Sequence, residues 1–168
     1  SVVGAPESVR LPLAGWTRRG IGRVFANDYD PALDGPTLRT DVAGANAAKL
    51  QLIYPPASGV RLVAPFETLS LLVRDEHQFA LELMVRTSDG KLGKLRYKTD
   101  LSTPILGRRR RATLPLLLIP LQDSPYRLLT VDLGADATLL ASGVTLDRVL
   151  AVKLQGRFQV GNIVLSDP

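Results

Sequence analysis

The sequence predicts an all-β domain, either a sandwich or a barrel. Apolar residues alternate with polar ones over several short segments, and clusters of Gly, Pro, Asp or Asn separate most of these segments. No amphipathic pattern is long enough for a helix of more than about three turns. With 168 residues, 45% hydrophobic and 22% charged, we expect a single domain over residues 1–168.

Seven segments have the composition and the alternation of strands. In chain order they are Lys49–Tyr54, Leu69–Arg74, Phe79–Arg86, Lys94–Lys98, Arg127–Leu133, Arg148–Leu154 and Arg157–Leu165. The clearest is Phe79–Arg86, in which every second residue is a large apolar one. Short strands separated by turn residues are typical of β-sandwiches and barrels.

The strands Phe79–Arg86 and Lys94–Lys98 are predicted to form a hairpin around Asp89-Gly90. A two-residue loop would place inward residues of one strand opposite outward residues of the other. A three-residue loop with Gly90 in the left-handed conformation keeps both apolar sets on one face. We therefore expect these pairs: Leu83 with Leu95, Leu81 with Tyr97, and Glu82 with Arg96.

The last predicted strand changes phase at Gly161-Asn162. The apolar residues have one parity before this point and the opposite parity after it: Phe158 and Val160, then Ile163 and Leu165. A β-bulge there restores a common buried face, and Gly accepts the backbone conformation that a bulge requires.

Two prolines interrupt the apolar segment Leu114–Leu121. Pro115 and Pro120 each remove a backbone donor, so we expect an edge strand or a covered loop rather than a central strand. The longest loops are predicted at Asp34–Pro36 and Ser102–Ala112.

Three segments near the C-terminus share a pattern with a known family: Tyr126–Leu133, Leu146–Leu154 and Phe158–Leu165, the last reading Phe-Gln-Val-Gly-Asn-Ile-Val-Leu. They resemble the closing strands of galactose-binding-like β-sandwiches, jelly rolls that serve as carbohydrate-binding modules and accessory domains of bacterial exported proteins. The resemblance implies an antiparallel two-sheet β-sandwich. It also implies a non-catalytic carbohydrate-binding or accessory role in an exported or envelope protein, secreted or periplasmic.

Aromatic residues restrict the kind of glycan expected. Only nine occur, and Phe79, Tyr97 and Phe158 have the parity of core residues. Sugars stack on exposed aromatic planes, so a neutral glycan is disfavoured. Trp16 and Tyr126 are the candidate stacking rings, and Trp16 lies where galactose-binding-like domains often carry an aromatic.

Basic residues point to an anionic ligand. The 21 Lys and Arg exceed the 16 Asp and Glu, which gives a net charge of +5. Four are consecutive on a predicted loop: Arg108, Arg109, Arg110 and Arg111. Their guanidinium groups suit phosphate, sulfate or uronate groups, and the alternative is a solvated loop that protects the neighbouring apolar strand from aggregation.

Other basic residues are predicted to extend this patch outward along the sheet: Arg86, Lys94, Arg96 and Lys98. Glu82, opposite Arg96, neutralises part of it. Nucleic acid also suits a positive charge, but single-strand binding needs aromatic rings among the basic residues, and Tyr126 alone lies near the four arginines. Nucleic acid is therefore disfavoured.

A group of carboxylates is the candidate metal site. Asp28, Asp30 and Asp34 precede Gly35, a pattern that suits a structural calcium ion. Pro31 interrupts the loop and no helices flank it, so an ordinary Asp/Pro/Gly turn is the alternative.

No catalytic motif is present, so we do not expect an enzyme. The chain has no Cys, and its one histidine, His77, lies in a predicted polar turn. No apolar stretch approaches the length of a membrane span. The alternative to glycan binding is a structural or assembly domain that contacts a protein partner, or a second copy of itself, through a sheet edge or through Leu114–Leu121.

Overall fold

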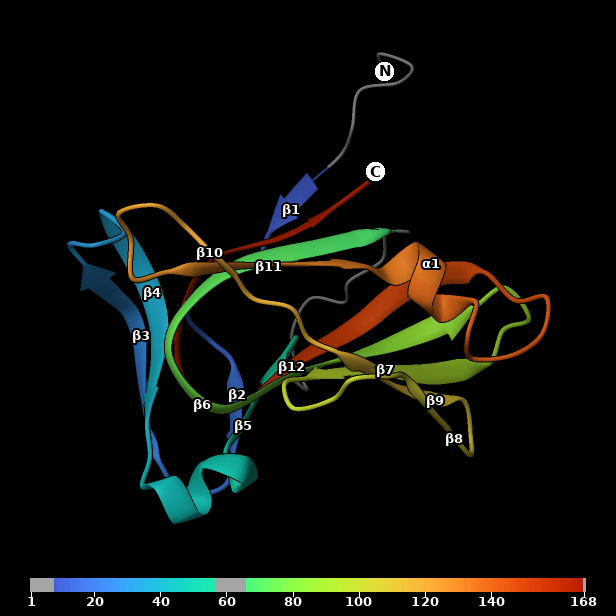
Figure 1. The fold of residues 1–168 in the computed structure, drawn as a ribbon, viewed down its shortest axis with the longest axis horizontal. Helices are drawn as coiled ribbons and strands as arrows, with labels where there is room; N and C mark the ends of the chain where they lie inside the picture. The colour runs from blue at the N-terminus through green and yellow to red at the C-terminus, as the bar shows by residue number, and fades with distance from the viewer. Residues whose placement is uncertain (1–7, 57–65, 168) are drawn as a thin grey trace.

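The computed structural model describes residues 8–56 and 66–167, which form a β-rich fold with two short helices (Figure 1). The helices are η1, a 3-10 helix (Gly44–Lys49), and α1 (Leu133–Ala137). The strands are β1 (Ser8–Arg10), β2 (Thr17–Arg19), β3 (Arg23–Asp30), β4 (Gly35–Asp41), β5 (Gln51–Tyr54), β6 (Thr68–Thr87), β7 (Leu92–Lys98), β8 (Ile105–Gly107), β9 (Arg111–Pro115), β10 (Ile119–Pro120), β11 (Arg127–Asp132) and β12 (Leu146–Ser166).

Two long strands, β6 and β12, organise the fold. They pair antiparallel from one end to the other and belong to both halves of the sheet. In the first layer, β11 lies beside β6, while β4 and β1 lie beside β12. In the second layer the order is β2-β5-β12-β6-β7-β9-β8. Figure 1 shows β6 curving from the first layer into the second, so that one sheet folds over on itself.

The bend between the layers depends on unusual backbone angles. Asp75 and Gln78 on β6 have φ of 52° and 51°, and Gly156 on β12 has φ of 106°. A Cβ at Gly156 would lie 2.4 Å from the backbone oxygen of Gln78, so only glycine fits where the strands bend together. The segment around His77, predicted as a turn between two strands, is therefore part of one continuous strand.

The hydrophobic core lies between the two layers. Inward side chains of β6 and β12 from both layers are buried, and at the bend the rings of Phe79 and Phe158 meet edge to face with centroids 5.5 Å apart. Alternate residues of the same strands face outward. The outward face of the second layer therefore carries the polar side chains that alternate with the core residues.

The all-β prediction is confirmed, but the connectivity differs from two separate antiparallel sheets. The twelve strands within residues 8–56 and 66–167 belong to one hydrogen-bonded network, because β6 and β12 pass through both layers. One pair, β7 with β9, is parallel. It forms because the chain reverses in β8 before it enters β9, so β9 runs in the same direction as β7.

The hairpin prediction is confirmed in its register. Leu81 pairs with Tyr97, Glu82 with Arg96 and Leu83 with Leu95. The backbone N–H of Thr87 donates to the carbonyl of Lys91, so three residues, 88–90, form the loop, and Gly90 has a φ of 82°, as the alternation of apolar residues requires.

The bulge in β12 is also confirmed, with a different residue in the left-handed conformation. The register shifts between Gly161 and Val164, and Asn162 rather than Gly161 has positive φ, at 50°. Gly161 is needed for another reason. A Cβ there would lie 2.4 Å from Cδ2 of Leu33, so the glycine lets Leu33 pack against β12.

Two predicted loops are more ordered than expected. Ser102–Ala112 contains β8 and the start of β9, which pair antiparallel around a turn at residues 108–110. At Asp34–Pro36 the turn is shorter, because β4 already begins at Gly35. In Leu114–Leu121 the residues between β9 and β10 belong to no strand, which agrees with the prediction of an edge or loop segment.

We expect Gly156→Ala to lower the free energy of unfolding by about 2–4 kcal/mol, because a Cβ meets backbone atoms at a positive φ. Urea denaturation followed by tryptophan fluorescence measures this. Gly35→Ala is the matched control, since its nearest atom is 4.0 Å from the new Cβ, and its change should stay within about 0.5 kcal/mol. Equal stability of the two variants would contradict the steric role of Gly156.

Candidate functional site

The outward face of the second layer gathers basic side chains from four strands around a carboxylate on a fifth. We call this surface the basic face and define it by six residues: Arg19, Glu82, Lys94, Arg96, Arg111 and Lys153. They belong to β2, β6, β7, β9 and β12, which the sheet order brings together although the sequence separates them. Five cations therefore share one surface with a single carboxylate.

Strand register explains why these side chains meet. Lys153 pairs with Glu82, and Glu82 pairs with Arg96, so the three lie in one row across β12, β6 and β7. Lys94 pairs with Arg111 in the parallel ladder between β7 and β9. Paired residues point to the same side of a sheet, and neighbouring strands are about 4.8 Å apart, so the charged groups form a compact array.

Glu82 lies at the centre of this array. Its carboxylate is 2.9 Å from Nζ of Lys153, 3.8 Å from Arg96 and 3.9 Å from Lys94, and only 12% of its side chain is exposed. The cations around it are more open, between 23% and 35% exposed. One carboxylate cannot neutralise three cations, so the array keeps an excess of positive charge beside solvent.

Two hollows open on the basic face. The larger, of about 320 Å³, lies among Arg96, Arg111 and Thr113, and the smaller, of about 210 Å³, lies beside Arg19 and is lined by Met84 and Ile53. Both share Glu82, Lys94 and Lys153, so they form one continuous surface. Among the described residues, no aromatic side chain lines either hollow.

The four consecutive arginines are separated by the structure. Arg111 joins the basic face, and Arg109 lines a further hollow with Lys94 and Arg111. Arg108 is exposed in the turn between β8 and β9. Arg110 instead binds the hairpin loop, where its guanidinium donates to Thr87 Oγ1 and to both carboxylate oxygens of Asp89.

The Arg110 contact has an electrostatic consequence. The guanidinium holds the pKa of Asp89 well below its usual range, with help from the Thr87 hydroxyl. Arg110 is therefore engaged within the fold and is not available to a ligand. The prediction that all four arginines bind a ligand together is corrected for Arg110, because its guanidinium is bound to Thr87 and Asp89.

The two candidate stacking rings are not exposed. Tyr126 is fully buried and its hydroxyl donates to Asp30 at 2.5 Å. Trp16 is 9% exposed, lies 5.4 Å from the ring of Tyr54 and donates its Nε1–H to the carbonyl of Pro12. Both rings pack inside the fold, so the stacking roles predicted for Trp16 and Tyr126 are corrected.

The three aspartates predicted to bind calcium each have another partner. Asp28 binds Arg39 at 2.8 Å, and Asp34 accepts a hydrogen bond from Tyr29 at 2.7 Å. Asp30 accepts from Tyr126, from Arg74 and from the backbone of Ala32.

Within residues 8–56 and 66–167, no group of three or more His, Asp or Glu side chains is arranged to hold a metal ion. The structure thus places Asp28, Asp30 and Asp34 apart rather than in one cation site, which corrects the calcium interpretation. Their sequence spacing serves the turn between β3 and β4 instead.

Asp30 links three parts of the first layer. Its side chain is 7% exposed, and it joins the end of β3 to Arg74 on β6 and to Tyr126 just before β11. The Tyr126 hydroxyl is the main reason that the pKa of Asp30 lies below its usual value, and burial opposes this shift. Burial, followed by the hydrogen bond to Asp30, raises the pKa of Tyr126.

The segment Leu114–Leu121, predicted as a protein contact, exposes several apolar side chains. Leu117 is 72% exposed and Ile119 is 50% exposed, and the neighbouring edge strand β8 exposes Ile105 and Leu106. The assembly role of this segment stays a prediction. Among the helices in the described part of the chain, none has the length and apolar character needed to span a membrane.

Comparison with known proteins finds a weak structural similarity. No family model matches the sequence, and no curated protein matches it. Among solved structures, the enzymatically active domain of bacteriophage CBA120 tailspike protein 4 superposes on 92% of this chain with a TM-score of 0.44 and 8% identity. The match covers 19% of that chain.

We expect Asp30→Asn to lower the free energy of unfolding at neutral pH by about 1–3 kcal/mol, because it weakens a buried charge-assisted contact. Because the folded-state pKa is lowered, Asp30 stabilises the fold above its unfolded pKa of about 3.9 and loses this effect as pH falls through the folded value. Unfolding curves from neutral to acid pH should therefore fall less steeply in the variant.

The control for this experiment is Asp147→Asn, which alters an exposed pair with Arg148 and should change stability by no more than about 0.5 kcal/mol. If Asp30→Asn were as stable as the control at neutral pH, Asp30 would not be a link between β3, β6 and β11.

Proposed function

We propose that this domain is a non-catalytic carbohydrate-binding module that binds an anionic glycan on the basic face. The observation that carries the proposal is the array of five cations around one central carboxylate on an outward sheet face. Guanidinium and ammonium groups from neighbouring strands suit carboxylate or sulfate groups repeated along an extended chain.

We further propose that the fold is a jelly-roll sandwich of the galactose-binding-like kind in an exported bacterial protein. Its support is the pair of layers joined by β6 and β12 and the C-terminal strands that resemble that family. In this arrangement the second layer presents the basic face outward while the core lies on its other side.

The chemistry of the basic face favours an anionic glycan over two other ligands. Neutral sugars and single-stranded nucleic acids both bind through stacking on aromatic rings, and neither hollow has one. The apolar contacts there come from Met84 and Ile53, which suit the carbon faces of a sugar ring. Charge supplies the rest of the affinity, so binding should be sensitive to salt.

The triple substitution Lys94→Gln, Arg96→Gln and Arg111→Gln should lower affinity for an oligogalacturonate at least tenfold, since it removes three of the five cations on the basic face. Isothermal titration at two salt concentrations should also show a weaker salt dependence in the variant. A neutral oligosaccharide of the same length serves as the ligand control.

Arg108→Gln is the matched control protein, because Arg108 is exposed and lies outside the basic face. It should bind nearly as well as the unaltered chain. The proposal would be rejected if the triple variant bound as tightly as this control. Tighter binding of a single-stranded oligonucleotide of equal charge would assign the basic face to nucleic acid instead.

Glu82→Gln should raise affinity for the same oligogalacturonate about twofold to fivefold. The carboxylate competes with the ligand for Lys153, Arg96 and Lys94, and each such contact is worth up to about 1 kcal/mol. Asp147→Asn removes an exposed carboxylate outside the basic face and serves as the control. Weaker binding by Glu82→Gln would mean that the carboxylate orients the cations more than it competes for them.

A further inference from the structure

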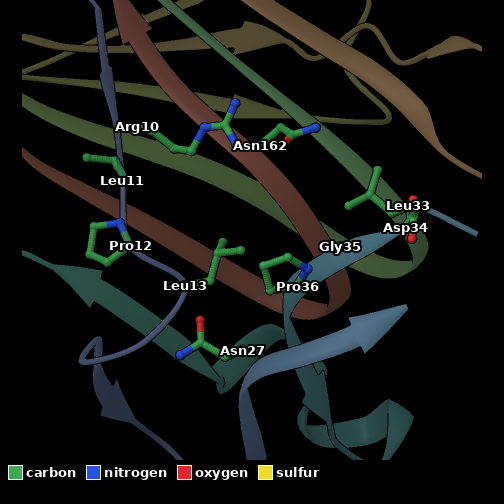
Figure 2. Close-up of a pocket in the computed structure, with 10 residues that line it drawn as sticks. All are labelled: Arg10, Leu11, Pro12, Leu13, Asn27, Leu33, Asp34, Gly35, Pro36 and Asn162. Carbon is green, nitrogen blue, oxygen red and sulfur yellow. The ribbon is translucent and has the colours of Figure 1, made fainter. Parts of the chain in front are cut away.

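A separate hollow of about 390 Å³ lies in the first layer, away from the basic face. It is bounded by the segment that follows β1, by the turn between β3 and β4, and by the bulge of β12 (Figure 2). In this view Leu13 and Pro36 lie between Asn27 on one side and Arg10 with Asn162 on the other. Two backbone hydrogen bonds hold the segment in place, from Leu11 to Ile163 and from Asn27 to Leu13.

Three polar residues of this hollow have a left-handed backbone. Asn27, Asp34 and Asn162 have φ values of 49°, 52° and 50°. Asn27 lies in a bulge of β3, Asn162 lies in the bulge of β12, and Asp34 lies in the turn between β3 and β4. Bulges redirect side chains and occur often beside binding sites, so two independent bulges bring an amide to the same hollow.

These polar groups are open to a ligand. The side chains of Arg10, Asn27 and Asn162 make no hydrogen bond or ion pair with any residue in the ranges 8–56 and 66–167. One carboxylate oxygen of Asp34 accepts from the Tyr29 hydroxyl, which leaves the other oxygen as an acceptor. Arg10 and Asp34 line the same hollow without pairing with each other.

An apolar wall completes the hollow. Leu13 and Leu33 are half-buried, and Pro36 lies beside them. Leu33 is fixed in this position because it lies against Gly161, where a Cβ would come within 2.4 Å of it. A ligand here meets carbon on one side and hydrogen-bonding groups on the rim, the arrangement found in small-molecule sites.

We propose that this hollow binds a sugar acid, a single hydroxylated ring that carries one carboxylate. The carboxylate lies at the Arg10 end, where a guanidinium can bind it bidentately. The ring packs on Leu13 and Pro36, and its hydroxyls bond to the amides of Asn27 and Asn162, each of which offers both donors and an acceptor. This site is distinct from the basic face and does not depend on the function proposed there.

Asp34 sets the orientation of the ligand. Its free carboxylate oxygen repels an anion but accepts hydrogen bonds from hydroxyl groups. Arg10 has the opposite preference, so the two charges select a molecule with an acid at one end and hydroxyls at the other. A simple anion satisfies only Arg10, and a neutral sugar satisfies only the amides and Asp34.

Nuclear magnetic resonance titration with three probes tests this selection. We expect glucuronate to shift the backbone amide signals of Asn27, Gly35 and Asn162, with an affinity at least tenfold higher than that of glucose or acetate. Arg10→Gln should lower the glucuronate affinity about tenfold and leave the weak glucose affinity unchanged. Arg108→Gln, an exposed arginine on another turn, should behave as the unaltered chain.

Asn162→Gly is the second variant, because glycine keeps the positive φ and removes only the amide group. It should lower the glucuronate affinity about threefold to tenfold without changing the unfolding midpoint by more than the Arg108→Gln control does. Equal affinities for glucuronate and glucose would overturn the role of Arg10. Shifts confined to the basic face, or none with any probe, would overturn the site itself.

Discussion

The pairing of β6 with β12 is the constraint on which the rest of the structure depends. These two strands run together through both layers, so one ladder fixes the position of the core, of the bend and of both surfaces. The bend is possible because Gly156 has no side chain, so the backbone of Gln78 can lie against it. The hydroxyl of Thr40 also donates to the carbonyl of Gly156 and accepts from the amide of Phe158. The pairing of β6 with β12 then sets the strand register on each side of the bend. In the second layer Lys153 pairs with Glu82, and in the first layer Asn162 lies in a bulge.

The two proposed sites use this ladder in different ways. On the basic face the strands are regular, and pairing between neighbours concentrates cations around Glu82. At the hollow beside Arg10 the ladder is interrupted, and the interruption itself directs Asn162 into the hollow. A regular array suits a repeated charge along a polymer, whereas an irregular hollow with one cation and one carboxylate suits a single small molecule. The basic face lies on paired strands, whereas the hollow lies between a short turn, a bulge and a segment that backbone hydrogen bonds hold in place.

The alternation of apolar and polar residues along the strands predicted the register of the β6–β7 hairpin and the bulge at Gly161-Asn162, because it shows which side of each strand is buried. The same patterns misplaced His77 in a turn, since polar residues at a bend look like those of a turn. The burial of Tyr126 depends on Asp30, 96 residues away, and no local pattern reveals such a contact. Lys94 and Arg96 were predicted to face outward, but Arg19 and Lys153 were missed because β2, β5 and β12 become neighbours only through long-range pairing.

We propose that an anionic glycan binds the outward face of the second layer. Mapping backbone amide shifts during titration with an oligogalacturonate tests it most directly. The largest shifts should lie on β6, β7, β9 and the first half of β12, around Glu82, Arg96 and Lys153, and they should diminish as salt is added. Shifts confined to the exposed edge at β8 and Leu117, or shifts unaffected by salt, would contradict it.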